Sequence, residues 1–437
     1  MDAIAKFFNF EAANTDWRTE VTGGVTTFMT MAYIVAVNPA IMSEALGEGL
    51  FGELLFATCA SAAIATLLMG LLANYPFALA PGMGLNAFFT YTIVLGMGVH
   101  WKLAMGVVLA SGLLFLLLTL LRVREAIITA VPEPIKRATA AGIGLFIAFI
   151  GLKNAGIIVG DQATLVSLGD VRTGPVGLAL VGVLGTGVLL ARGVRGAILL
   201  GVVGVALFAM VLGVTPWPLG VVSMPVWPVH IFGEAIYHLP EAFHVALIEL
   251  VFAFLFVDLF DTMGTLVGLS ERVGFLDKDG QLPRANKALL ADSVGTVCGS
   301  VLGTSTVTTY IESAAGISSG ARTGFASVIT GGFFIGALFF TPLVQAIPPF
   351  ATAPALIVVG TLMMVPAAKI VWDDVSDAVP AFLTLIAIPL TFSIADGLAL
   401  GFVAYPIIKR LSNKGDEVHP LVDVLAVIFI AKYLFMT

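Results

Sequence analysis

Three carboxylates, Asp258, Asp261 and Glu312, lie within strongly apolar stretches of the sequence. A charged side chain costs about 2.5 to 3.5 kcal/mol at the centre of a bilayer on insertion scales, so each calls for a specific role. Spacings of three and four residues place Asp258, Asp261 and Thr265 on one face of a helix. Such carboxylates can accept hydrogen bonds from ring N–H and amine groups of a flat heterocycle, or they can carry a proton. Asp258 also has a structural interpretation, in which it braces a neighbouring helix through Ser or Thr partners.

The chain is interrupted within an apolar stretch at residues 81–89, which read PGMGLNAFF. The proline and two glycines forbid a continuous helix before Leu85, so we expect a short extended segment followed by a half-helix. Asn86 is a neutral polar group beside this break, and it suits either contact with a ligand or satisfaction of the loose backbone. Phe88 or Phe89 either stacks on a planar ligand or packs in the core.

A second interruption falls at residues 303–310, GTSTVTTY, where β-branched residues favour extended backbone. Small, helix-compatible residues follow at 313–316. Irregular backbone at membrane depth is tolerated only where protein or a watery cavity satisfies its polar groups. Two interruptions at matching positions of the chain therefore indicate a substrate site between them, with the N-termini of the half-helices facing the ligand.

The composition places these residues in a membrane protein. Of 437 residues, 59% are hydrophobic and 11% are charged, and the mean hydropathy is +1.03, whereas soluble domains carry about 25% charged residues. The net charge of −7 argues against a nucleic-acid partner. Cys59 and Cys298 lie in apolar windows without metal-ligand neighbours, and no nucleophile elbow or phosphate-binding loop is present. We therefore expect no metal, no cofactor and no enzymatic activity.

The apolar windows predict an all-α polytopic protein with about fourteen membrane spans, two of which contain the short extended segments. The spans lie near residues 24–46, 54–73, 84–98, 102–121, 138–151, 174–191, 196–213, 243–269, 286–302, 308–319, 324–341, 355–371, 379–394 and 397–411. An odd number of spans in each half, about seven and seven, gives the halves opposite orientation, which is the inverted-repeat arrangement of many transporters. Thr66 and Gly70 in the second span resemble Thr296 and Gly299 in the ninth, as such a repeat predicts.

The distribution of Lys and Arg predicts a cytoplasmic N-terminus in a multi-pass protein of the inner cell membrane. The outer loops keep only Lys102, Lys153 and Arg172. The inner loops hold most of the others, among them Arg18, Arg122, Arg124, Lys136, Arg137, Arg192, Arg195, Lys278, Arg322, Lys369 and Lys409. The last apolar stretch, 420–436, either crosses the membrane or lies along its surface.

Three motifs, in order, resemble those of the AzgA-like adenine, guanine and hypoxanthine permeases, a branch of the nucleobase cation symporter family 2. They are residues 81–89, residues 259–266 (LFDTMGTL) and residues 303–313 (GTSTVTTYIES). The likeness runs from Asp16 through the fourteenth span, which is nearly the whole chain. It implies proton-coupled symport of purine bases into the cell by alternating access, so that a purine base, a proton and the lipid bilayer are the expected partners.

The resemblance also implies a division into two moving parts. The core domain would comprise residues 24–121 and 240–343, and the gate domain residues 122–239 and 344–411, flanked by a cytoplasmic N-terminal segment (1–23) and a C-terminal segment with an apolar helix (412–437). The core would move against the gate and carry the substrate site across, and a homodimer would form through the gate domain.

The resemblance assigns the substrate to Asp261 and Glu312, between two short antiparallel strands of the third and tenth spans. Backbone groups near Ala87, Phe88 and Ile311 would add hydrogen bonds to the purine ring. The resemblance and the apolar setting together make Glu312, Asp261 and Asp258 the candidates for proton coupling.

Two features separate this chain from other carriers of that fold. Thr265 stands where the uracil carriers have a histidine, so no histidine relay is expected. The residues 313–316, SAAG, replace the pattern of the urate and xanthine branch. An anion transporter or channel of the same fold is the alternative, but the predicted site offers acidic groups where an anion would need a basic one.

Overall fold

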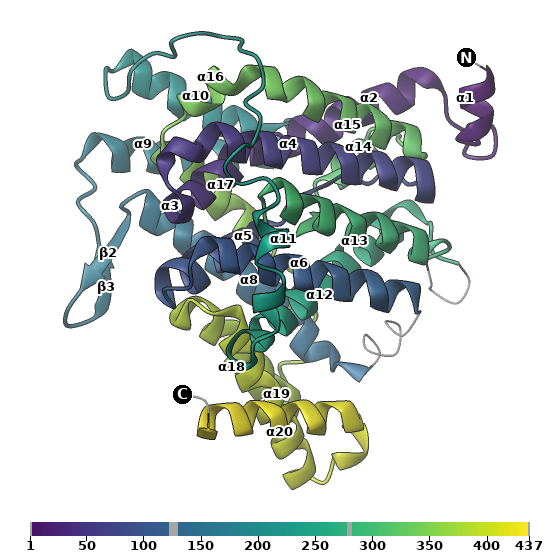
Figure 1. The fold of residues 1–437 in the computed structure, drawn as a ribbon, viewed down its shortest axis with the longest axis vertical. Helices are drawn as coiled ribbons and strands as arrows, with labels where there is room; N and C mark the ends of the chain where they lie inside the picture. Colours follow the sequence, from purple (N-terminus) through teal and green to yellow (C-terminus); the bar gives the residue numbers. More distant parts are fainter. Residues whose placement is uncertain (1, 122–129, 278–281, 436–437) are drawn as a thin grey trace.

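The computed structural model describes residues 2–121, 130–277 and 282–435. Their helices pack side by side, with the N-terminus and the C-terminal helix at opposite ends of the long axis (Figure 1). Arg122, Arg124 and Lys278, which the sequence places in inner loops, lie outside the described residues.

The first half of the chain forms helices interrupted by one short strand and one hairpin. Its elements are α1 (Asp2–Phe7), α2 (Trp17–Met31), α3 (Ile34–Leu46), α4 (Phe51–Leu68), β1 (Leu79–Pro81), α5 (Met83–Ala87), α6 (Trp101–Leu120), α8 (Glu133–Asn154), β2 (Ile158–Asp161), β3 (Leu165–Leu168), α9 (Gly174–Ala191) and α10 (Ala197–Val211). A 3-10 turn, η1 (Glu48–Leu50), precedes α4, and π-helical segments follow α4 and α5: η2 (Met69–Ala73) and η3 (Phe88–Gly96).

The second half repeats this scheme with a single strand. Its elements are α11 (Glu234–Tyr237), α12 (Val245–Val273), α13 (Ala285–Leu302), β4 (Val307–Thr309), α14 (Ser313–Ser318), α15 (Gly324–Ala337), α16 (Thr341–Gln345), α17 (Pro349–Leu362), α18 (Val375–Thr391), α19 (Ile394–Leu411) and α20 (Pro420–Phe435). Short 3-10 turns join them: η4 (Pro240–Phe243), η5 (Leu338–Phe340), η6 (Val365–Lys369) and η7 (Gly415–Glu417).

Many of these helices are long and apolar. Within the described residues, eight helical stretches have the length and composition to cross a membrane, and shorter apolar helices, among them α20, accompany them. Because a bilayer offers backbone groups no partners, its spanning segments must satisfy their hydrogen bonds internally, as helices do. The prediction of a mainly helical, polytopic membrane protein is confirmed, whereas the number of fourteen spans stays a prediction.

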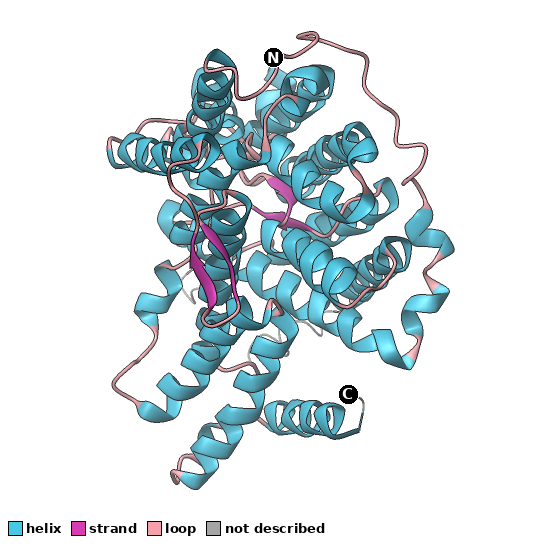
Figure 2. Cartoon of the chain, turned by 90° about the vertical axis from the view of Figure 1, so that its left-hand side faces the viewer, coloured by secondary structure: helices cyan, strands magenta, loops and turns pink. Residues whose placement is uncertain are grey.

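The two predicted interruptions form one small sheet at the centre of the molecule. β1 and β4 pair antiparallel, with Leu79 opposite Thr309 and Pro81 opposite Val307. Figure 2 shows this strand pair enclosed by helices. The short extended segments of the third and tenth spans are thereby confirmed, and each satisfies the backbone of the other at membrane depth.

One threonine side chain holds each of the two strands, and the two threonines make the same kind of contact. Thr66 Oγ1 of α4 donates to the carbonyl of Leu79 and accepts from its N–H, each at 2.9 Å. Thr296 Oγ1 of α13 makes the same pair of bonds to Val307, each at 3.1 Å. The sequence likeness around Thr66 and Thr296 therefore corresponds to equivalent contacts in the two halves, as an inverted repeat predicts.

Two features were not predicted from the sequence. The first predicted span, 24–46, is interrupted: α2 ends at Met31 and α3 begins at Ile34, with a turn between them. The second is the hairpin of β2 and β3, in which Ile158 pairs with Leu168 and Asp161 with Leu165. This hairpin projects from the helices at the side that faces the viewer in Figure 2.

Helix contacts surround the central strands on two sides. α13 packs against α4 and α6, and α15 against α2 and α4, and within this set α4 and α13 contact the strands directly. α8 packs against α17 and α18, and α9 against α10 and α17. The space between these two sets of helices is where the candidate site lies.

Candidate substrate site

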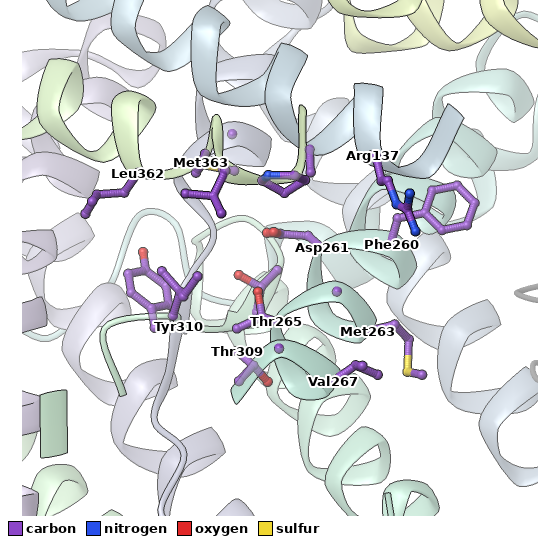
Figure 3. A pocket seen from close by; sticks show the side chains of 18 of the residues that line it. Arg137, Phe260, Asp261, Met263, Thr265, Val267, Thr309, Tyr310, Leu362 and Met363 are labelled. Atoms are coloured by element: carbon purple, nitrogen blue, oxygen red, sulfur yellow. The ribbon is translucent and has the colours of Figure 1, made fainter. Parts of the chain in front are cut away.

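A cavity of about 500 Å³ lies between α12, α8, α17 and the two chain interruptions. We call it the substrate cavity, since its volume is within the ~300–1,000 Å³ of typical small-molecule sites. Its wall combines acidic, hydroxyl and apolar side chains (Figure 3). The lining includes Tyr33, Met83, Gly84, Glu133, Lys136, Arg137, Phe260, Asp261, Thr265, Glu271, Thr308, Tyr310, Ile311, Glu312, Leu362, Met363 and Lys369.

α12 presents Asp261 and Thr265 to the cavity from successive turns (Figure 3). Asp261 and Thr265 share a helix face as their spacing predicted, whereas Asp258, which was predicted on the same face, does not line the cavity. Gly264 and Gly268 line the cavity on the same helix, and a Cβ on either would meet nothing within 4 Å. This face of α12 is therefore open beside the Asp261 carboxylate.

Glu312 lies in the turn between β4 and α14 and faces the same cavity. The Tyr33 hydroxyl donates a 2.5 Å hydrogen bond to Glu312 Oε1, and Thr30 Oγ1 donates to the Glu312 carbonyl across 3.3 Å. These contacts require α2 and α14 to approach closely, and a Cβ on Gly316 of α14 would collide with the backbone of Gly23 in α2. The structure thus brings Asp261 and Glu312, from segments far apart in the sequence, to one cavity.

Tyr33 is a site residue that the sequence analysis missed. It occupies the turn between α2 and α3, which neither glycine nor proline marks. Its whole side chain is buried. The available signal was a tyrosine within an apolar span, because a buried phenol hydroxyl needs a hydrogen-bond partner.

Asp258 lies one turn before Asp261 but points away from the substrate cavity, toward α13. It is fully buried, and Thr296 Oγ1 donates to its Oδ2 atom across 3.3 Å. Beside it, the buried Asp292 of α13 accepts a 2.9 Å hydrogen bond from Thr262. These threonine contacts are of the kind expected for a carboxylate that braces two helices.

Asn86, Ala87 and Phe88 are buried and do not belong to the cavity wall. The Asn86 side-chain oxygen accepts a hydrogen bond from Ser305, so the amide joins the two interruptions to each other. The Phe88 ring packs against Phe254 of α12, with 5.3 Å between ring centroids. Their predicted contacts with a substrate stay predictions.

Other residues of the interruptions do reach the cavity. Met83 and Gly84 line it from the start of α5, and Ile311 lines it from the turn before Glu312. A Cβ on Gly84 would collide with Ile143 of α8, so the glycine permits the close packing of α5 on α8. Of the residues in α5, Met83 and Gly84 therefore line the cavity, whereas Asn86 and Ala87 are buried outside its wall.

One end of the substrate cavity carries a charged rim. Lys136 of α8 pairs with Glu133 at 2.9 Å, and Arg137 donates to the carbonyl of Lys369. Figure 3 shows Arg137 beside Phe260, away from Tyr310. Lys136, Arg137 and Lys369 belong to the predicted inner loops, so the cavity opens toward the predicted cytoplasm.

The other end of α8 joins a polar cluster. Tyr91 donates to Glu44 Oε1 at 2.7 Å, and Asn154 Nδ2 donates to the Tyr91 hydroxyl at 2.9 Å and to Glu44 at 3.2 Å. The Lys153 ammonium lies 4.7 Å from the centroid of the Tyr91 ring. We call Glu44, Tyr91, Lys153 and Asn154 the outer cluster. It ties α3 and the π-helical segment after α5 to α8, on the predicted outer side.

Among residues 2–121, 130–277 and 282–435, no group of three or more His, Cys, Asp or Glu side chains is arranged to hold a metal ion.

Comparison with known proteins identifies the family. Residues 18–400 match the model of a family described as the Permease family. The chain belongs to this permease family. The guanine/hypoxanthine permease PbuG of Bacillus subtilis is 46% identical to it over 98% of this chain and 99% of PbuG. The adenine permease AdeP of Escherichia coli is 40% identical over 99% of this chain and 96% of AdeP.

A solved structure supports the fold alone. The transmembrane domain of the bicarbonate transporter BicA from a cyanobacterium superposes with a TM-score of 0.62, covering 88% of this chain and 97% of that domain at 17% identity. The resemblance to the AzgA-like permeases and the inverted-repeat fold are confirmed. The permease is an integral membrane transporter and not an enzyme.

Proposed function

We propose that this permease carries purine nucleobases into the cell in symport with protons. The observation that carries the proposal is the meeting of Asp261 and Glu312 at one cavity of about 500 Å³. The relatives named as guanine/hypoxanthine and adenine permeases, which align over nearly their full lengths, support a purine as the substrate.

The cavity suits a flat base with several N–H groups. Ionised carboxylates only accept hydrogen bonds, so Asp261 and Glu312 match the ring N–H and exocyclic amine groups of a purine. Thr265 and Tyr310 line the same cavity and add hydroxyl groups that can donate to ring nitrogens. Met363, across the cavity from Asp261 in Figure 3, offers apolar contact for a ring face.

Glu312 is the residue that we assign to the coupled proton. Its carboxylate is held by Tyr33 and lies in the turn where β4 gives way to α14. Protonation would remove the charge of Glu312 at membrane depth, where a charged side chain is costly. The protonated and deprotonated carriers would therefore differ strongly in free energy. Asp261 and Asp258 are the other candidates, and only Asp261 shares the cavity with Glu312.

Transport would proceed by alternating access between a core and a gate. We propose the core as residues 24–121 and 240–343 and the gate as residues 122–239 and 344–411, with the N-terminus in the cytoplasm and a homodimer through the gate. The charged rim lines the substrate cavity, whereas the outer cluster lies at the other end of α8, outside the cavity wall. In the proposed cycle, this arrangement corresponds to an inward-facing state.

An anion is a poorer match to this site. BicA transports bicarbonate, but its likeness to this chain concerns the fold. In the substrate cavity, Asp261 and Glu312 would repel a small anion, and the cations lie at the rim. The acidic pair therefore favours the purine proposal over the anion alternative.

Uptake into proteoliposomes tests the proposal. Purified protein is reconstituted, and uptake of radiolabelled guanine, hypoxanthine and adenine is followed with and without an inward proton gradient. We expect gradient-driven accumulation in the wild type and its loss in Glu312→Gln. Asp161→Asn is the matched acid-to-amide control, because the Asp161 side chain accepts hydrogen bonds from Ala163 and Thr164 in its own hairpin turn, away from the substrate cavity.

Two results would count against the proposal. If no purine accumulates under any gradient while the protein stays monodisperse, the purine assignment is wrong, and flux of bicarbonate or sulfate should be measured instead. If Glu312→Gln accumulates purines as the wild type does, the proton is carried elsewhere.

A further inference from the structure

Glu312 lies between two cavities. Besides the substrate cavity, a second cavity of about 240 Å³ reaches the same side chain, and we call it the side cavity. Glu312, Ile311, Leu362 and Val365 line both. Among the described residues, Glu312 is the only acidic residue that lines both cavities, so this residue borders two separate spaces.

The side cavity is kept open by small residues. Ala314 and Ala315 line it from α14, Ala197 from the start of α10, and Thr30 from α2. Since a water molecule occupies about 30 Å³ in the liquid, the space has room for several waters. The Thr30 hydroxyl and the Glu312 carboxyl are polar groups at which such waters can bind.

The side cavity opens on the same side of the protein as the charged rim. Val194 and Gly196 in its wall belong to the loop between α9 and α10. Arg192 and Arg195 of that loop are exposed, and the positive-inside rule places them in the cytoplasm. Both cavities thus lead from Glu312 toward the predicted cytoplasm, by different routes.

A bound purine would separate these routes. Asp261 and Tyr310 face Glu312 from the substrate cavity, and Tyr33 bonds to Glu312 Oε1. A base between Asp261 and Glu312 would cover the carboxylate on that side. The side cavity would remain open, and within the described chain Glu312 is its only charged lining residue.

We infer that Glu312 exchanges its proton with the cytoplasm through water in the side cavity, independently of the purine in the substrate cavity. The inference rests on the proposed function. In this step the Glu312 O–H bond breaks, the proton passes to a water of the side cavity and on to bulk water, and the carboxylate keeps the electron pair. Release of the proton then does not have to wait for release of the base.

Filling the side cavity tests the inference. Ala314→Leu fills it from α14 and Val194→Phe from the α9–α10 loop, so a folding defect in one variant leaves the other for the test. Leu200→Phe is the control, because Leu200 lies on the exposed face of α10 and is 45% exposed. For each protein we would measure guanine binding, guanine counterflow at equal pH on both sides, and net uptake driven by a proton gradient.

Counterflow and net uptake place different demands on the carrier. In counterflow, labelled guanine exchanges for unlabelled guanine while the carrier keeps its proton. In net uptake, each cycle must release a proton inside. We expect the filled variants to bind and exchange guanine like the wild type while net uptake falls several-fold, and we expect Leu200→Phe to change none of the three.

Two outcomes would overturn the inference. Unchanged net uptake in both filled variants would show that the proton leaves by another route. Loss of guanine binding in both monodisperse variants would assign the side cavity to the purine. A wild type that neither binds nor exchanges guanine would overturn the proposed function as well, and this result is recognised without any variant.

Discussion

The two ends of α8 are built in opposite ways: one lies at the charged rim of the substrate cavity, and the other lies in the outer cluster. At its first turns, α8 carries Lys136 and Arg137 to the charged rim. At its last turn, it carries Asn154 to the outer cluster with Glu44 and Tyr91. The 22 residues of α8 span about 33 Å at 1.5 Å per residue, which is one membrane thickness.

The contacts at the two ends differ in what they connect. At the rim, Lys136 pairs with Glu133 one turn away on the same helix, and Arg137 donates to the carbonyl of Lys369 in η6, so these contacts stay within segments of the proposed gate. In the outer cluster, hydrogen bonds join α8 to α3 and to the π-helical segment. A few hydrogen bonds of about 1 kcal/mol each can hold α8 against its neighbours at this end and still break in every proposed transport cycle. In the proposed transport cycle, α8 is the element against which the site moves.

The largest expected effect comes from fixing the closed end permanently. In a Glu44→Cys/Asn154→Cys double variant, a short bifunctional thiol reagent should join the two positions, whose side chains now lie 3.2 Å apart. The proposed alternating access requires the outer cluster to open in every cycle, so cross-linking should abolish purine uptake. Either single cysteine variant, treated in the same way, is the control for modification alone. Uptake that continues in fully cross-linked protein would rule out movement at this end.

The second-largest expected effect distinguishes the two aspartates of α12 by their contribution to guanine binding. Asp261 lines the cavity, whereas Asp258 faces α13. Removal of a charge-assisted hydrogen bond costs about 1.5–3 kcal/mol, so Asp261→Asn should weaken guanine binding by about 10- to 150-fold. Asp258→Asn should leave the affinity unchanged and affect the stability or the coupling instead. Calorimetric titration of both variants checks this, and equal losses of affinity would mean that the cavity face of α12 is assigned wrongly.

A moderate effect is expected from weakening the outer cluster without cross-linking it. Asn154→Ala removes hydrogen bonds to Tyr91 and Glu44. A loss of about 1 kcal/mol would shift the balance toward opening at that end by about five-fold. The rate at which a membrane-impermeant maleimide labels Thr265→Cys from the outer side measures this shift. Asp161→Asn in the same background should not change the rate, and an unchanged rate in Asn154→Ala would remove the outer cluster from the closing mechanism.

The smallest effect is expected at the charged rim. Lys136→Gln breaks the ion pair with Glu133, whose side chain is 60% exposed. Exposed pairs contribute about 0–1 kcal/mol, so stability and the apparent affinity for guanine should change little, and less still at high salt. Thermal unfolding and uptake kinetics at two salt concentrations provide the measurement. A complete loss of uptake would show that the rim takes part in substrate binding.

The sequence predicted the parts of the site that depend on backbone chemistry and helical spacing. Pro81 and Gly82 exclude a continuous helix, and the β-branched run before Tyr310 favours a strand, so both interruptions were predicted. The spacing of Asp261 and Thr265 requires a shared helix face, and both line the cavity. These predictions depend only on local backbone conformation and helix geometry, and for that reason they agree with the structure.

The sequence could not predict what depends on packing between distant segments. Tyr33 reaches Glu312 only because α2 bends at a turn that no proline or glycine marks, and because Gly316 lets α14 approach α2. Asn86 and Phe88 have residue types that suit a ligand, but in α5 and the π-helical segment after it they contact Ser305 and Phe254 instead. The side cavity exists because several distant small residues meet beside Glu312, and no local pattern records that meeting.

Protection of a cysteine inside the cavity tests the central claim most directly. Thr265→Cys places a thiol beside Asp261, and Ser412→Cys places one on an exposed position outside the cavity. We predict that saturating guanine slows maleimide labelling of Thr265→Cys in purified protein and leaves labelling of Ser412→Cys unchanged. Equal labelling rates of Thr265→Cys with and without guanine, in a variant that still takes up guanine, would show that the purine binds elsewhere.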